Sequence, residues 1–322
     1  MLLCNYDIRI KNNDGKVLYF PYVVDCEIES TWQTLTNTCT FSLPRKAGQL
    51  INKSLDKILQ VGNEVHVQAG YNANLQTLFR GYITSIGAGI PLQIKCEDAM
   101  WLLKKVQVDK TWKKATLAQI IKDIAPAGMD VKCDNRVLGN MRYSKVTAAQ
   151  VLRDLQENHS VYSYVRNGTL HCGFAYDSQN LSGNADGSFH FEKNILENNL
   201  EYKTKDQLAV RIDCISKYSN GKDVKYSYPS DNYEGEVHTL HSYEKPVAEL
   251  KQDAKVMYER LVYEGFRGSF TTYGHPIIDH GAKVELQSDM YPDRNGWYRV
   301  DKVVYRLGLE GIKQIITVGG RA

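Results

Sequence analysis

Short runs of alternating apolar and polar residues dominate the first hundred positions. Such runs lie at residues 6–10, 17–24, 39–43, 61–71, 79–86 and 92–96. Successive side chains of a β-strand point to opposite faces, so each run is typical of a strand with one buried face. An Asn-Asn-Asp-Gly turn at residues 12–15 joins the first two runs as in a hairpin. Many short strands at regular spacing predict a small β-barrel over residues 1–104.

Residues 105–176 follow a helical period instead. Apolar side chains fall on one face of a helix that starts after Thr116, and Thr116 and Gln119 stand at the spacing of a capping box. The same pattern returns 31 positions later, from Thr147 to Gln150 and onward. A short apolar run follows each helix, at residues 129–133 and 162–165. The segment is therefore predicted to be a small α+β domain made of two similar helix–strand units.

The remainder of the chain is predicted to hold a linker and a second barrel. Residues 177–190 form the linker, because most of this segment is rich in Ser, Asn, Gly and Asp and has no apolar period. Strands resume over residues 191–322, with one long helix near residues 246–264 that has a single apolar face. Pro246 is suited to the first turn of that helix.

The last forty residues repeat the order of the first barrel. Residues 280–287 match 61–68 in turn position and polarity, 295–300 match 80–85, and 311–316 match 89–94. Identity within each block is weak, but all three blocks keep the same order, which indicates a structural duplication. The predicted fold class is α+β, mainly β, with two similar small β-barrel domains flanking a small helix–strand domain.

Composition narrows the functional classes. A chain of 322 residues fits two or three domains of roughly 100 residues each. The net charge of +3 comes without a dense Lys/Arg block, so no specific nucleic-acid sequence is expected as a partner. The densest basic run, residues 104–114, is interpreted as a solvated edge.

The cysteines and the apolar runs indicate in which cellular compartment the protein is expected. No apolar stretch approaches the roughly 20 residues that span a bilayer, so no stable membrane insertion is expected. The opening residues lack the basic and apolar regions of a signal peptide. Single cysteines without a CxxC pair indicate reduced, buried thiols in a cytoplasmic protein. They are Cys4, Cys26, Cys39, Cys96, Cys133, Cys172 and Cys214.

The histidines do not suggest a metal site. His238 and His241 lie on opposite faces if they belong to a strand, and His275 and His280 lie near a turn. Zinc sites need three or four ligands at compact spacing, and neither HExxH nor Cys/His pairs occur. Surface or turn histidines are the favoured interpretation, and no metal-binding residue is predicted.

Catalytic motifs are also missing from the sequence. No GxSxG elbow and no glycine-rich phosphate loop occur, so no catalytic and no cofactor-binding residue is predicted. Paired carboxylates could in principle serve a glycosidase. Asp123 and Asp154 occupy equivalent positions of the two repeated helices, however, where solvent exposure is the simpler account. The acids considered for such a pair are Asp123, Asp154, Glu157, Glu197 and Glu201.

Four tyrosines stand in polar surroundings and suggest a binding face for sugar or protein. The alternative is that they pack on their own domain or on a neighbouring subunit, and a contact between subunits is favoured over sugar. These residues are Tyr226, Tyr228, Tyr233 and Tyr243.

Three further patterns recur together in one known family. A strand at residues 39–43 leads to a Gly-led turn and strand at 61–67 and to a Phe-x-Gly strand at 78–83. Residues 265–281 carry a G-x-x-G…G-x-P-x-x-x-x-G arrangement, and residues 296–300 read G-x-Y-x-V. This order resembles the phage tail hub family, which includes the late control D protein of P2-like phages, the Mu-type tail protein, the T4-like baseplate hub and the N-terminal part of VgrG spikes.

The resemblance implies a structural role without enzymatic activity or cofactors. It implies a homotrimer whose six barrels form a pseudo-sixfold ring joining a hexameric tail tube to a trimeric spike. The chain ends at Ala322 without a spike-like segment, so a separate spike protein is expected beside the tube protein, with a tape-measure protein as a further partner. Such a protein would assemble in the bacterial cytoplasm and then reside in a virion tail or an injection-machine baseplate.

Three alternatives remain open at this point. A VgrG-like spike base of a type VI-like secretion or contractile injection system would use the same fold. A cell-wall hydrolase would need one of the acids named above. A carbohydrate-binding adhesin would use the tyrosine-bearing segment.

Overall fold

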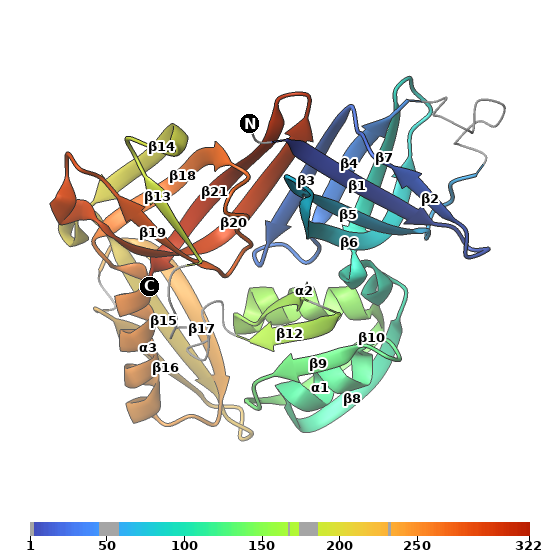
Figure 1. Ribbon diagram of the computed structural model, residues 1–322. Coiled ribbons are helices and arrows are strands. Elements are labelled where there is room, and N and C mark those ends of the chain that lie inside the picture. Colours follow the sequence, from blue (N-terminus) through green and yellow to red (C-terminus); the bar gives the residue numbers. More distant parts are fainter. Residues whose placement is uncertain (1–2, 45–57, 167, 174–185, 231–232) are drawn as a thin grey trace.

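The computed structural model describes residues 3–44, 58–166, 168–173, 186–230 and 233–322. Over these residues the chain forms one large sheet of 13 strands, with smaller sheets and three α-helices below it (Figure 1). The α+β, mainly β class is therefore confirmed. Three separate hydrophobic cores lie in the large sheet, in a helix–strand lobe and in a lobe that contains the longest helix.

The N-terminal half of the large sheet has seven strands in the order β2-β1-β5-β6-β7-β4-β3. Their alternating buried residues enter the main core, as the sequence pattern predicted. The bounds are β1 (Cys4–Lys11), β2 (Val17–Phe20), β3 (Asp25–Thr31), β4 (Thr38–Leu43), β5 (Glu64–Tyr71), β6 (Asn74–Ile86) and β7 (Leu92–Asp98).

The C-terminal half has six strands in the order β13-β19-β20-β21-β18-β14. A short 3-10 helix, η6 (Pro292–Arg294), precedes β20. The bounds are β13 (Gly187–His190), β14 (Ile195–Lys203), β18 (Gly265–Tyr273), β19 (Lys283–Gln287), β20 (Gly296–Gly308) and β21 (Gly311–Arg321).

The two halves share one strand order. The path β1-β5-β6-β7-β4-β3 corresponds strand by strand to β13-β19-β20-β21-β18-β14. The first strand differs in direction, because β1 is antiparallel to β5 whereas β13 is parallel to β19. The turn before the second strand is also shared: the amide of Gly62 donates to the carbonyl of Ile83 at 2.8 Å, and the amide of Gly281 donates to that of Val300 at 2.7 Å.

The strand registers test the predicted duplication residue by residue. Matching Gly62 to Gly281 aligns residues 61–68 with 280–287, as predicted. The β6–β7 and β20–β21 ladders align residues 89–94 with 311–316, again as predicted. The middle block was displaced by two residues: Ile83 corresponds to Val300, so Tyr298 and not Gly296 takes the place of Gly81. Matching the two blocks by their glycines caused that error.

A further pair of equivalent strands escaped the sequence comparison. Phe41 of β4 lies opposite Ile94 of β7, and Phe270 of β18 lies opposite Ile316 of β21. Both phenylalanines are fully buried. Strand β4 is therefore the equivalent of β18, and their neighbours β3 and β14 are equivalent edge strands.

The halves are not two closed barrels. Among the described strands, β3 of the first half pairs with β20 of the second, which joins both halves into one open sheet. The length of β20 is the physical reason. Its first four residues pair with β19, and its last seven, from Lys302 to Gly308, extend beyond β19 and leave an edge that β3 occupies.

The helix–strand lobe lies between β7 and β13 in the chain and contains the two predicted helices. Both have complete capping boxes, at Thr116 with Gln119 and at Thr147 with Gln150. The basic run at residues 104–114 falls largely in β8, which pairs with β10. The bounds are η3 (Ala99–Lys104), β8 (Gln107–Thr116), α1 (Leu117–Ile124), β9 (Asp130–Cys133), β10 (Val137–Thr147), α2 (Ala148–His159), β11 (Tyr162–Arg166) and β12 (Thr169–Gly173).

The helix expected near 246–264 belongs to a lobe of its own, inserted between β14 and β18. There α3 packs on a three-stranded sheet in the order β16-β15-β17. At the equivalent place in the first half, residues 32–37 alone join β3 to β4. The bounds are η5 (Lys205–Gln207), β15 (Val210–Lys217), β16 (Asp223–Tyr228), β17 (Glu236–Tyr243) and α3 (Val247–Leu261).

The predicted linker at 177–190 falls partly outside the described residues, which omit 174–185. Its last four residues were misassigned, because Gly187–His190 form β13 and pair with β19. Its parallel partner β19 lies almost a hundred positions away in the sequence, so no local hairpin pattern predicts β13.

Candidate functional site

The seam between the two halves is the antiparallel pair of β3 and β20, and ion pairs join these two strands. Glu29 lies 2.7 Å from Lys302, and Glu27 lies 3.0 Å from Arg306. Such cross-strand pairs each add a fraction of a kcal/mol and fix the register more than the stability. The Tyr6 hydroxyl donates to the carbonyl of Gly308 at 2.8 Å, so β1 also holds the end of β20.

A Ser–His–Asp cluster closes the seam at one end. Ser30 Oγ lies 2.5 Å from Asp279 Oδ1, to which it donates, and 2.6 Å from His280 Nδ1. Arg166 of the helix–strand lobe donates to the carbonyl of His280 and lies 3.9 Å from Asp279. His280 is 2% exposed, so it is a turn residue as predicted but a buried one. The cluster thus ties β3, the turn before β19 and β11 together.

The geometry of this cluster is not that of a catalytic triad. In a triad the two ring nitrogens of histidine serve different partners, one the serine and the other the carboxylate. Here Ser30 and Asp279 both approach Nδ1 of His280, and Nε2 is buried away from both. The neighbouring groups partly desolvate the half-exposed Asp279, which opposes its ionisation, but the hydrogen bond and charge of His280, the charge of Arg166 and the Ser30 hydroxyl together lower its pKa. The carboxylate is thereby held charged as a structural acceptor.

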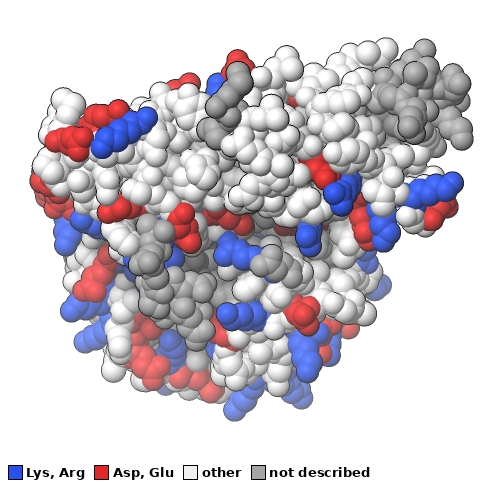
Figure 2. All heavy atoms as spheres, in the orientation of Figure 1, with Lys and Arg blue, Asp and Glu red and all other residues white. Residues whose placement is uncertain are grey.

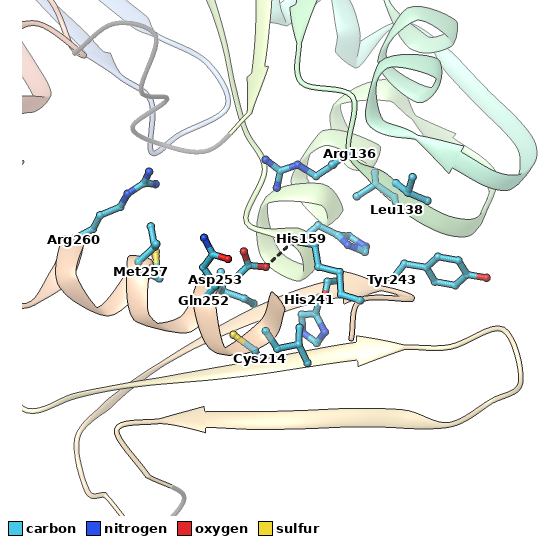
Figure 3. A pocket seen from close by; sticks show the side chains of 16 residues that line it. Arg136, Leu138, His159, Cys214, His241, Tyr243, Gln252, Asp253, Met257 and Arg260 are labelled. Atoms are coloured by element: carbon cyan, nitrogen blue, oxygen red, sulfur yellow. Dashed lines mark hydrogen bonds and ion pairs between the residues drawn. The ribbon is translucent and has the colours of Figure 1, made fainter. Parts of the chain in front are cut away.

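A cavity of about 440 Å³ opens between the helix–strand lobe and the α3 lobe (Figure 3). Arg136 and Leu138 lie on one side and Met257 and Arg260 on the α3 side. The rings of His159 and His241 meet edge to face, with centroids 6.4 Å apart. Burial lowers the pKa of both imidazoles, which keeps them neutral at pH 7.

The side chains of this cavity do not form a nucleophile with its base. Burial raises the pKa of the Cys214 thiol to about 12, so it is not a reactive thiolate. Asp253 is paired with Lys245 at 2.6 Å. The cavity is a partly apolar gap where two lobes meet, and His241 contributes to it although it was predicted to be a surface residue.

One group among the described residues has a metal-like arrangement: His190, Glu192 and Asp289. Sequence reasoning missed it because Asp289 lies 99 positions from His190. Each ring nitrogen already has a carboxylate partner, Glu192 at 2.9 Å and Asp289 at 3.1 Å. Ser288 donates to Glu192 at 2.7 Å as well. These contacts account for the group as a polar link between β13 and the loop after β19.

The acids considered for a glycosidase are spread over three elements, α1, α2 and β14. Asp123 accepts from Trp112 Nε1 at 2.7 Å, and the equivalent Asp154 accepts from the hydroxyl of Tyr143. Both aromatic residues are again 31 positions apart, so the repeat of the lobe includes these contacts. The prediction that Asp123 and Asp154 are simply exposed to solvent is therefore incomplete. Glu157 is exposed on α2, and Glu197 and Glu201 are exposed on β14.

The tyrosines pack largely within the chain. Tyr226 and Tyr228 lie against the core of the α3 lobe, and the ring of Tyr228 meets that of Tyr258 edge to face at 5.0 Å. Tyr243 packs over Gly139 of the helix–strand lobe, leaving no room there for a Cβ. Tyr233 is half-buried.

Charged residues are unevenly distributed over the surface. In the view of Figure 2, charged side chains gather over the two lower lobes with both signs mixed, and the band formed by the large sheet is mostly uncharged. Among the described residues, no helix is long and apolar enough to cross a membrane.

Comparison with known proteins finds similar structures but no matching family model or curated sequence. No protein-family model matches the chain, and no curated protein matches it either. The tail protein from Neisseria meningitidis MC58 is similar with a TM-score of 0.68 and 16% identity, over 98% of this chain and 96% of that one. The 43 kDa tail protein of prophage MuSo2 from Shewanella oneidensis is similar with a TM-score of 0.62 and 14% identity, over 98% and 97%.

A third similar structure comes from a secretion machine. The E. coli c3393 protein, described as a component of the type VI secretion system, has a TM-score of 0.60 and 11% identity over 98% of this chain and 77% of that one. At these identities the likeness is one of fold. The chain has the fold that these tail proteins and this secretion component share.

Proposed function

We propose that the chain is a structural hub protein of a contractile phage-type or prophage tail. Three copies form a pseudo-sixfold ring that joins a hexameric tail tube to a separate trimeric spike protein, with a tape-measure protein as a further neighbour. In this role no catalytic, cofactor-binding or metal-binding residue is assigned, and the protein is not an enzyme.

One observation carries the proposal: a single chain repeats the same six-strand order in two halves that share a continuous sheet. Three chains would therefore present six similar units around a ring, with about 60° between successive units. A ring of this kind can match a sixfold partner on one side and a threefold partner on the other. The tail-protein fold along 98% of the chain supports the same role.

The proposed ring assigns a task to each segment. Residues 1–104 and 187–322 contribute the two similar units, each a candidate for a barrel-like wall once neighbouring copies are in place. Residues 105–176 form the helix–strand domain outside the wall. Such a protein would assemble in the bacterial cytoplasm before joining a virion tail or an injection-machine baseplate.

A spike base of a type VI-like secretion system is the second candidate. The likeness to the E. coli secretion component favours it, since that match also covers 98% of this chain. The genes that flank the coding sequence distinguish the two, because tail cassettes and effector clusters differ in content. Hydrolase and adhesin functions have no comparable observation in their favour.

Mass in solution tests the proposal directly. Light scattering after size exclusion is expected to give three chain masses at high protein concentration, and negative-stain images should show rings that bind polymerised tube protein. A chain that stays monomeric and binds no tube protein would contradict the hub. Clearing of a peptidoglycan suspension by the purified chain would support the hydrolase instead.

A further inference from the structure

Strand β14 has one unpaired edge among the described residues. It hydrogen-bonds to β18 only and ends the path of the large sheet (Figure 1). The amide of Leu200 donates to the side chain of Asn198 at 2.9 Å, so this amide faces away from β18. Because backbone groups alternate along an antiparallel strand, Asn198, Leu200 and Tyr202 direct their amides and carbonyls to the open edge.

Strand β6 has an open edge of its own at its C-terminal end. Ile83 is the last β6 residue that bonds the β5 side, where its amide donates to Asn63 at 2.9 Å. The Gly87 amide donates to Gln93 at 2.8 Å, in the direction of β7. By the same alternation, the amide and carbonyl of Ile86 face away from β7, and no described strand pairs with them.

The duplication specifies what belongs on these two edges. Strand β3 corresponds to β14, and the C-terminal part of β20 corresponds to the end of β6. Within the chain, β3 and β20 are paired, with Ser30 opposite Val303 and Thr31 opposite Lys302. The two open edges thus correspond to the two sides of the internal seam, one in each half of the large sheet.

We infer that β14 of one copy pairs antiparallel with the end of β6 in the next copy, continuing the sheet from chain to chain. This inference rests on the proposed ring and adds its register. Transferring the β3–β20 register places Tyr202 opposite Ile86 and Lys203 opposite Ser85 of the next copy. The partner is a second copy of this chain, because only that copy repeats the geometry of the internal seam. The contact is head-to-tail, so it does not stop at a dimer, and in the proposed trimer the third copy closes the ring.

This seam is shorter than the internal one. Strand β6 ends at Ile86, whereas its counterpart β20 runs on to Gly308. The ion pairs of the internal seam have no full counterpart, because Asn199 stands where β3 has Glu27, and Gly89 where β20 has Arg306. The contact between copies is therefore expected to be weaker than the seam within a chain.

Paired cysteines test the register. Lys203 and Ser85 form a pair that is not hydrogen-bonded, with Cα atoms about 4.5 Å apart, which suits a disulfide. Mild oxidation of the Ser85→Cys/Lys203→Cys variant is expected to shift most of the chain to two-chain and three-chain bands on non-reducing gels. Each single variant should remain a one-chain band.

Two further pairs serve as controls. Glu27→Cys/Arg306→Cys joins two directly opposite positions within the internal seam, so its disulfide should form without any change in mass. Ser85→Cys/Glu197→Cys puts the second thiol at the far end of β14 and should not cross-link. Cross-linking of this displaced pair as strongly as the Lys203 pair would overturn the register.

A backbone variant tests the edge without cysteines. In this register Tyr202 and Ile86 are the hydrogen-bonded pair, because the amides of both residues face the open edges. Proline is tolerated on an edge strand where its missing amide faces outward, so Tyr202→Pro is expected to fold but to lose the trimer. Tyr202→Val removes the same ring but keeps the amide, and it should keep the trimer. Unchanged circular dichroism confirms folding of the proline variant.

The outcomes separate this inference from the hub proposal. A wild-type trimer with no Ser85–Lys203 cross-link, or a Tyr202→Pro variant that remains trimeric, overturns the edge pairing and leaves the hub intact. A wild-type monomer without cross-links overturns both. A cross-linked trimer that is lost in Tyr202→Pro and kept in Tyr202→Val supports the pairing.

Discussion

Asp98 illustrates how burial and hydrogen bonding oppose each other at a single residue. Its carboxylate accepts from the amides of Met100 and Asn37 at 3.0 and 3.1 Å, which caps η3 and holds the loop before β4. The side chain is almost fully buried, and this burial raises the pKa of Asp98 to about 7 although the two hydrogen bonds act in the opposite direction.

The stability of the chain as a function of pH should show the protonation of Asp98. Between pH about 4, the ordinary value for aspartate, and pH about 7, the folded chain holds a proton that the unfolded chain has released. The free energy of unfolding should therefore fall as pH rises through this window. In Asp98→Asn this contribution disappears, so urea midpoints measured from pH 5 to 8 should flatten.

The exposed Asp109→Asn variant is the matched control and should keep the wild-type profile. An Asp98→Asn variant that retains the full wild-type slope would contradict the assignment of the proton to Asp98.

At the scale of elements, the capping boxes connect sequence and structure most directly. Thr147 accepts from the amide of Gln150 at 3.2 Å, and Gln150 accepts from the amide of Thr147 at 2.7 Å. Helix α2 buries five residues in the core of its lobe, so its first turn supports that core.

Removing one cap should lower the stability of the lobe measurably. Thr147→Ala is expected to reduce the free energy of unfolding by about 1 kcal/mol. Thr147→Ser retains the accepting oxygen and should stay near wild type. Hydrogen exchange of α2 amides measures the effect within the lobe, and equal protection in the alanine and serine variants would contradict it.

The elements that sequence reasoning found are those with a local signal. Capping residues, helical faces and strands β4 to β7 follow from spacing within the segment itself. Strand β8 was interpreted as a solvated basic edge, because its lysines are mostly exposed and only Val108, Trp112 and Ala115 are buried. Strand β3 alternates buried and charged residues, but the partners of its glutamates lie on β20, more than 270 positions away.

The contacts at the seam between the two halves could not be predicted from the sequence for the same reason. Ser30, Arg166 and Asp279 meet only because three distant segments converge, and no spacing in the sequence connects them. The repeated blocks did predict which strands are equivalent. They could not predict that β20 would also bind β3, since that depends on the lengths of β19 and β20.

At the scale of the whole molecule, the α3 lobe is an addition to a repeated framework. Lys203 of β14 lies opposite Gly265 of β18, so the two ends of the insertion are adjacent. The equivalent strands β3 and β4 are joined by residues 32–37 alone. A short connection is thus compatible with this sheet.

Excision of the lobe should leave the large sheet folded. Replacing residues 205–261 by a six-residue Gly/Ser loop retains Tyr263, which packs in the main core. Near-wild-type hydrogen-exchange protection of β18, β20 and β21 is expected. The full-length Leu250→Asp variant, which introduces a charge into the lobe core, is the companion test. Loss of protection in all three strands of both variants would show that the lobe is needed by the sheet.

The pairing of β3 with β20 also sets the order of events during synthesis. Residues 25–31 leave the ribosome early, whereas their partners at 302–308 emerge more than 270 residues later. At bacterial elongation rates of about 5–20 residues per second, β3 waits for its partner for tens of seconds. During that interval β3 can pair with β4 only, so Asp25, Glu27 and Glu29 lie on a strand with one open edge. Charged side chains on such an edge discourage association with other nascent chains. The acidic residues of β3 are therefore expected to disfavour such association until residues 302–308 are synthesised.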